Sequence, residues 1–271
     1  MSEGYYESTL RTEEALKEAL KIIDRRISHH SIPLYFGIMA AGTDDEQLLK
    51  KAKTVFTAAL RGMYLYDRYH ETGENIFLAA AEAQMKIVYG EMQPKQAIEL
   101  RMLWEDLLKF FDFEVEIREK QHIKKQFSRK EIDRYMELKS SDAYFYARIV
   151  EFLVGVDLRQ ICYVNMRLLD ILNDFIEYEK DYREGEPNLI IMMLLSFGRE
   201  QIPQNYSAAL RVMKNLGVIS EIKEMVDAEV GSIAGVDLGR FNLALYPALI
   251  KADWIYHLMN LPSKQQIPSP Y

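Results

Sequence analysis

Glycine and proline are sparse in this chain, and this sparseness limits its fold more than any other feature. The 271 residues include 13 glycines and 8 prolines, and three of the prolines lie in the last ten residues. Because these residues form turns and interrupt helices, their small number favours long helices over a sheet of many short strands. Apolar residues recur every three or four positions, as between Leu48 and Met63, and no period-2 alternation extends beyond a few residues. The sequence therefore predicts an all-α protein.

Helix start signals agree with this periodicity. Thr43 to Glu46 and Ser128 to Glu131 both fit the capping box, in which a hydroxyl and a carboxylate satisfy backbone N–H groups. No fixed repeat, low-complexity segment or Pro/Ser-rich linker divides the chain, so we predict a single all-α domain over residues 1–271, with frayed ends at 1–10 and 262–271. The predicted helices are 12–28, 44–71, 75–92, 94–125, 129–153, 157–183, 188–197, 205–215, 219–230 and 241–260.

Composition excludes several functional classes. A formal net charge of −7 gives no electrostatic attraction to nucleic acid or to anionic membranes. The single cysteine, Cys162, excludes an intrachain disulfide and a Cys-based metal cluster. The first residues carry no signal or transit pattern, and the longest apolar run, Leu189 to Leu195, is too short to span a bilayer. We therefore expect a cytoplasmic protein with no transmembrane segment and no nucleic-acid partner.

An acidic stripe lies on the side of the predicted helix 157–183 that is opposite its apolar face. Asn173, Glu177 and Asp181 lie at positions i, i+4 and i+8. Four residues advance a helix by about 6 Å and overshoot a turn by about 40°, so these three oxygen donors stack on one face of a continuous helix. Their mutual repulsion would be reversed by a divalent cation, and hard oxygen ligands suit Mg²⁺. A solvated acidic face, with Lys180 as a local partner, is the alternative interpretation.

The segment NDFIEYEKD, from Asn173 to Asp181, resembles the second metal motif of bacterial class I terpene synthases, N-D-x-x-S-x-x-x-E. The Tyr-Glu-Lys-Asp ending, followed by Gly-Glu and Asn-Leu, resembles the common continuation in that family with a one-residue gap. Glu177 replaces the usual Ser or Thr, and Asp181 is one methylene shorter than the usual Glu. The resemblance implies that Asn173, Glu177 and Asp181 bind Mg²⁺, that Asp174 belongs to the catalytic set, and that Lys180 binds diphosphate.

The same helix also resembles the second aspartate-rich motif of trans-prenyltransferases, D-D-x-x-D, over residues 173–177. Upstream, the segment YMELKS, which ends at Ser140, resembles the Lys-Thr stretch that those enzymes place one helix earlier, and this implies that Lys139 binds diphosphate. A surface lysine is the alternative. Asp170 stands where those enzymes carry Gln. The two families share one fold, so both resemblances imply a helical bundle of the class I isoprenoid (terpenoid) synthase type.

The resembled fold places a first metal motif on an earlier, facing helix. Asp67 and Glu71 are the best candidates, because they are four residues apart at the end of the predicted helix 44–71. Arg68 stands where the family carries a second acid, and a plain surface helix end is the alternative. Arg129 lies near the position of a diphosphate-sensing arginine in terpene synthases, and it also fits a surface residue at a helix start.

The resemblances together imply an Mg²⁺-dependent enzyme that holds three Mg²⁺ ions with a prenyl diphosphate, ionises it and cyclises the allylic cation. Asp67, Glu71, Asn173, Glu177 and Asp181 are the expected metal ligands. One alternative is a prenyltransferase on the same fold, either chain-elongating or coupling head to head. Another is a non-catalytic isoprenoid-binding or scaffold homologue, which the reduced first motif favours. A homodimer is compatible with the sequence.

Overall fold

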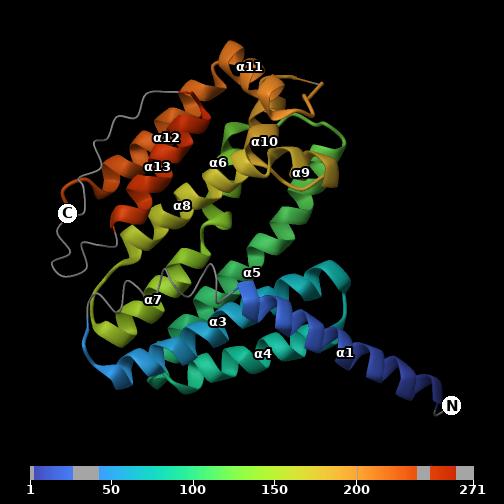
Figure 1. Ribbon diagram of the computed structural model, residues 1–271, viewed down its shortest axis with the longest axis vertical. Coiled ribbons are helices and arrows are strands. Elements are labelled where there is room, and N and C mark those ends of the chain that lie inside the picture. Colours follow the sequence, from blue (N-terminus) through green and yellow to red (C-terminus); the bar gives the residue numbers. More distant parts are fainter. Residues whose placement is uncertain (1–2, 27–42, 200, 237–244, 261–271) are drawn as a thin grey trace. The chain divides into compact units, whose positions relative to one another are not determined.

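The computed structural model describes residues 3–26, 43–199, 201–236 and 245–260, with side chains from Glu13 onward (Figure 1). Every regular element in these ranges is helical and none is a strand, which confirms the all-α prediction. None of these helices combines the length and apolar character needed to cross a membrane. The helices are α1 (Glu3–Arg26), α3 (Glu46–Thr72), α4 (Asn75–Gly90), α5 (Pro94–His122), α6 (Arg129–Lys139), α7 (Asp142–Val154), α8 (Arg159–Ile176), α9 (Tyr178–Glu184), α10 (Leu189–Ser196), α11 (Tyr206–Leu216), α12 (Val218–Ile233) and α13 (Tyr246–Leu258).

Most predicted helices coincide with observed ones to within a few residues. The first helix begins at Glu3, ahead of the predicted residue 12, so residues 3–10 are helical. The predicted frayed end at 262–271 and the predicted helical residues 27–28 and 241–244 lie outside the described residues. Two helices that were predicted as continuous are wrong, because each is two helices in the structure. The segment 129–153 is divided into α6 and α7, and the segment 157–183 is divided into α8 and α9.

A pair of serines separates α6 from α7. The Ser140 hydroxyl donates a hydrogen bond of 2.6 Å to Asp170 Oδ2, and the Ser141 hydroxyl donates one of 2.6 Å to the carbonyl of Leu138. Short hydroxyl side chains compete with the backbone for such partners, which makes them poor residues for a helix interior. The interruption therefore comes from local serine chemistry together with a buried acid on another helix.

The chain packs as two compact units. Unit 1 comprises residues 1–104 and 148–157, and unit 2 comprises residues 105–147 and 158–271. Two of the three boundaries fall inside helices, α5 and α7, and the third lies in the short connection between α7 and α8. The single domain expected over 1–271 stays a prediction.

Unit 1 is built on the antiparallel pair of α3 and α4, against which α1 also packs (Figure 1). The two helices approach closely at Gly62, where an added Cβ would lie 3.0 Å from the sulfur of Met85. Arg61 on α3 holds α1 through a forked ion pair with Asp24, with N–O distances of 2.7 and 2.8 Å. The planar guanidinium matches a carboxylate in this arrangement, so the pair fixes orientation as well as proximity.

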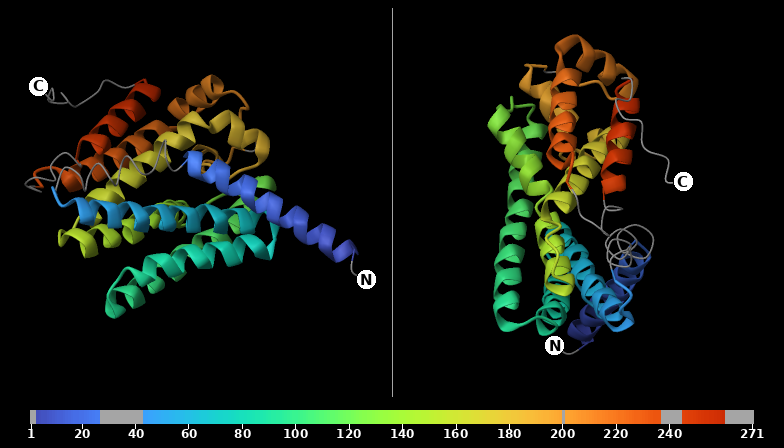
Figure 2. Two further views of the ribbon diagram at one scale, coloured as in Figure 1. Left: turned by 60° about the horizontal axis from the view of Figure 1, so that its bottom comes forward. Right: turned by 90° about the vertical axis from the view of Figure 1, so that its left-hand side faces the viewer.

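Helix α8 is the centre of unit 2, because α6, α9, α10, α12 and α13 all pack against it. Figure 2 shows α12 and α13 alongside α8 from two further directions. The longest apolar run of the sequence, Leu189 to Leu195, makes up all of α10 except its last residue. All seven residues of this run are buried. A helix that is apolar on every side belongs in a protein core, and here it lies at the end of α8 that carries the acidic segment.

Candidate functional site

The acidic segment spans a break between two helices. Helix α8 ends at Ile176 and α9 begins at Tyr178, so the predicted uninterrupted helix is wrong at Glu177. Backbone bonds still bridge the break, because the Glu177 N–H donates to Asn173 O at 2.7 Å and the Glu177 carbonyl accepts from Asp181 N at 2.9 Å. The side chains of Asn173 and Glu177 are exposed, whereas Asp181 is buried. The three expected metal ligands therefore do not share one solvent-facing stripe.

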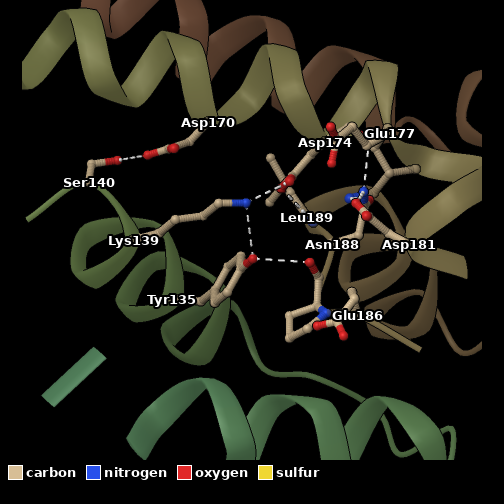
Figure 3. Close-up of polar contacts among 12 residues, drawn as sticks. Tyr135, Lys139, Ser140, Asp170, Asp174, Glu177, Asp181, Glu186, Asn188 and Leu189 are labelled. Carbon is tan, nitrogen blue, oxygen red and sulfur yellow. Dashed lines mark hydrogen bonds and ion pairs between the residues drawn. The ribbon is translucent and has the colours of Figure 1, made fainter. Parts of the chain in front are cut away.

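A buried ion pair lies beside this break (Figure 3). Lys139 Nζ, at the end of α6, donates to Asp174 Oδ1 on α8 at 2.6 Å and to the hydroxyl of Tyr135 at 3.2 Å. That hydroxyl in turn donates to the carbonyl of Pro187 at 3.2 Å. Burial alone lowers the pKa of Lys139, but the neighbouring Asp174 carboxylate raises it well above its usual value. The structure thus brings together two residues that are 35 positions apart and that both belong to the resembled motifs.

The second oxygen of Asp174 caps another helix. Asp174 Oδ2 accepts the backbone N–H of Leu189, the first residue of α10, at 2.9 Å. Helix N-termini favour negative charge, because their first N–H groups have no partner within the helix. The Asp174 side chain, only 3% exposed, therefore joins α6, α8 and α10 through one carboxylate.

Asn188 links this carboxylate to the rest of the segment. Its fully buried amide donates to the Asp174 carbonyl and to Asp181 Oδ2, both at 2.8 Å, while its Oδ1 accepts the N–H of Ile190 at 3.0 Å. Burial raises the pKa of Asp181 to about 6, against the opposing hydrogen bond from Asn188. Sequence reasoning used Asn188 only as part of a motif continuation. Its position directly before an apolar run was the signal for an N-cap residue.

Two further acids have raised pKa values: Asp170, one helical turn before Asp174 on α8, and Asp142 on α7. Asp170 accepts the Ser140 hydroxyl, and burial raises the Asp170 pKa to about 6 although Lys139 lowers it. Asp142, at the start of α7, has a fully buried Oδ1 without a hydrogen-bond partner. Burial, followed by the charge of Asp170, raises the pKa of Asp142 to about 8. Sequence reasoning missed Asp142, because no sequence pattern connects it to the acidic segment.

The candidates for the first metal motif belong to unit 1. Asp67 and Glu71 lie in the last turns of α3, and Glu71 pairs with Arg68 at 2.6 Å. Both acids line a cavity of about 400 Å³ between α1, α3 and α4. Its acidic lining residues are Glu18, Asp67, Glu71 and Glu74. Asn173, Glu177 and Asp181 lie in unit 2, and the expected facing arrangement of the two acid groups stays a prediction.

The other two expected diphosphate-binding residues are exposed and paired with carboxylates. Lys180 Nζ lies 3.3 Å from Glu177, whose hydrogen bond and charge raise the Lys180 pKa. Arg129, at the start of α6, pairs with Asp133 at 3.0 Å and with Glu221 at 2.6 Å. Exposed pairs of this kind contribute only about 0–1 kcal/mol each, so an anionic ligand can compete for either cation at small cost.

In the described part of the chain, no group of three or more His, Cys, Asp or Glu side chains is arranged so that it could hold a metal ion. The donor set around the α8–α9 break consists of one amide and two carboxylates, which are hard oxygen ligands of the kind Mg²⁺ prefers. Mg²⁺ commonly uses only one or two protein carboxylates and takes its other ligands from substrate phosphates and water. Asn173, Glu177 and Asp181 therefore fit such an ion in chemical type.

Comparison of the chain with family models, with curated proteins and with solved structures finds no match.

The buried ion pair leads to a first prediction. Lys139→Met should lower the free energy of unfolding by about 3–5 kcal/mol, because it leaves the Asp174 carboxylate buried without its cation. Chemical denaturation measures the loss. The matched control is Lys180→Met, which breaks an exposed Lys–Glu pair and should cost less than about 1 kcal/mol. Equal losses in the two variants would contradict the assignment of Lys139 as the compensating charge.

The acids with raised pKa values predict that stability falls as pH rises. Unfolded Asp142 ionises near its ordinary pKa of 3.8, whereas folded Asp142 keeps its proton up to about pH 8. The unfolded state therefore binds fewer protons in this window, and the free energy of unfolding falls by up to about 1.4 kcal/mol per pH unit from this group.

Asp142→Asn should remove this contribution, since the amide mimics the protonated acid. Urea unfolding across the window should show the variant gaining on the wild type as pH rises towards about 8. Glu224→Gln, an exposed change in unit 2, should follow the wild-type curve. If Asp142→Asn also runs parallel to the wild type, Asp142 is not held protonated by the fold.

Proposed function

We propose that this chain is a class I isoprenoid-type enzyme that ionises a prenyl diphosphate with the help of Mg²⁺ and cyclises the resulting allylic cation. The observation that carries the proposal is the 2.6 Å contact between Lys139 and Asp174. Both residues belong to motifs that resemble those of trans-prenyltransferases, and Asp174 also belongs to the motif that resembles terpene synthases. Their contact brings the two motifs close together in space, as a shared diphosphate site would need.

Asn173 and Glu177 are the residues best suited to hold the metal, because both are exposed one turn apart next to Asp174. Asp181 is buried and accepts a hydrogen bond from Asn188, so it becomes a ligand only after that hydrogen bond loosens. Asp67 and Glu71 of unit 1 stay the candidates for the first metal motif. When bound, Mg²⁺ supplies Lewis-acid stabilisation of the charge on the departing diphosphate.

The lysines supply the remaining positive charge. Lys180 is exposed and weakly paired with Glu177, so it can exchange that carboxylate for a phosphate oxygen. Lys139 places a second ammonium next to the motif while it neutralises Asp174. In the reaction the C–O bond of the substrate breaks, its electron pair leaves with the diphosphate, and an allylic cation remains. We favour cyclisation over coupling to a second isoprenoid, because the sequence after Asp181 is closer to that of the cyclases.

A non-catalytic isoprenoid-binding homologue is the second candidate, and two observations favour it. Glu71 is paired with Arg68, which stands where a second acid is usual. The core beside Asp174 also contains the polar groups of Asp170 and Asp142, whereas a carbocation needs a dry and apolar surrounding. Such a protein would bind the diphosphate without breaking the C–O bond.

Incubation with geranyl, farnesyl and geranylgeranyl diphosphate plus Mg²⁺ tests the enzyme proposal. We expect diphosphate release with at least one of these substrates and none after chelation of the metal. Binding of a substrate without release would support the non-catalytic candidate. Absence of release with all three, together with absence of any Mg²⁺-dependent stabilisation, would refute both.

The metal-binding residues are tested by thermal melts with Mg²⁺ and pyrophosphate. The wild type should gain stability, because a ligand that binds only the native state stabilises it. Glu177→Gln removes an exposed carboxylate and should abolish most of this gain while leaving the metal-free melting temperature almost unchanged. Glu184→Gln, an equally exposed change at the end of α9, should keep the full gain. A full gain in Glu177→Gln would mean that the acidic segment is an ordinary solvated surface.

A further inference from the structure

Arg167 is a buried cation of unit 2 with N–H groups that lack hydrogen-bond acceptors among the described residues. The Arg167 side chain on α8 is only 10% exposed, and its fully buried Nε and Nη1 atoms have no hydrogen-bond partner in the part of the chain that the structure describes. The carboxylate of Glu229 on α12 lies 3.3 Å from Nε, close enough for an ion pair but without the direction of a hydrogen bond. Buried charged donors are costly to leave unpaired, so the site favours an additional acceptor.

Two tyrosines lie beside this guanidinium. Tyr163 precedes Arg167 by four residues on α8, so both occupy one face of the helix. Tyr144 of α7 stacks on Tyr163, with ring centroids 4.9 Å apart and planes 21° apart. Burial raises the pKa of both tyrosines, and the charges of Arg167 and Glu229 also act on both. Among the described residues neither hydroxyl forms a hydrogen bond, and Tyr144 is 38% exposed, which leaves one side open to solvent.

We propose that Arg167, Tyr144 and Tyr163 form a binding site for the carboxylate of a small molecule. A guanidinium fork matches the two oxygens of a carboxylate, and its unpaired N–H groups are directional donors. The two phenolic hydroxyls are further donors for the same anion. Arg167 lies seven residues before Asp174, about 10 Å along α8, so this site is separate from the diphosphate site and does not depend on the proposed function.

The charge of the surroundings selects a carboxylate over a phosphate. Glu229 and Glu137 act on the same tyrosines, so each additional negative charge on a ligand meets repulsion. A carboxylate brings one negative charge, whereas inorganic phosphate brings up to two.

NMR of the Arg Nε–H signals in ¹⁵N-labelled full-length protein tests the site. The Arg167 signal is identified by its loss in Arg167→Lys, and the wild type is titrated with acetate and benzoate against chloride at matched ionic strength. We expect a saturating shift of the Arg167 signal. Tyr163→Phe and Tyr144→Phe should each weaken binding by about threefold to tenfold, the loss of one hydrogen bond. Tyr182→Phe, a half-buried tyrosine on α9, should bind as the wild type does.

Three results would overturn the proposal. One is the absence of a saturable shift with either carboxylate in the wild type. Another is an affinity for the carboxylate that is unchanged in both Tyr144→Phe and Tyr163→Phe. These two variants test the proposal even if Arg167→Lys does not fold. The third is binding of inorganic phosphate at least as tight as that of acetate, which would contradict the choice of a singly charged ligand. None of these results depends on Mg²⁺ or pyrophosphate.

Discussion

The burial of one carboxylate, that of Asp174, is the constraint on which the rest of unit 2 depends. A charge that leaves water must find partners, and Asp174 finds them in the ammonium of Lys139 and in the first N–H of α10. These contacts fix the end of α6 and the start of α10 against α8. The apolar run of α10 is thereby placed in the core, and the amide of Asn188 is placed where it reaches Asp181.

One face of α8 carries an unusual amount of charge for a helix at the centre of a bundle. Arg167, Asp170 and Asp174 follow one another at intervals of three and four residues, and all three are buried. The three groups have different partners. Asp174 pairs with a lysine, Asp170 accepts a hydroxyl and has a raised pKa, and Arg167 forms an ion pair with Glu229 but no hydrogen bond from Nε or Nη1 among the described residues. Polar faces of this kind are costly for stability, which is why we associate this face with ligands.

The exposed and buried members of the acidic segment have different roles. Glu177 occupies the break between α8 and α9, and its side chain is exposed and pairs only with the exposed Lys180 among the described residues. Asp181 has the same spacing in the sequence, but it faces the interior and is held by Asn188. Asp181 follows the buried Asp174 by seven residues, about two helical turns, and shares its buried face, whereas Glu177 lies on the exposed face. Equal spacing along the chain does not ensure equal exposure.

Local physical chemistry let the sequence alone determine the all-α class, most helix limits and the capping box at Ser128, which the structure contains as predicted. Resemblance to known motifs singled out Lys139 and Asp174, but only the tertiary structure joined them. The contact of Ser140 with Asp170, the bond of Asp181 to Asn188 and the burial of one carboxyl oxygen of Asp142 appear only in the tertiary structure. Periodicity in the sequence shows which residues share a helix face. Whether a charged residue on that face is buried depends on the segment that packs against it, and the local sequence does not show which segment that is.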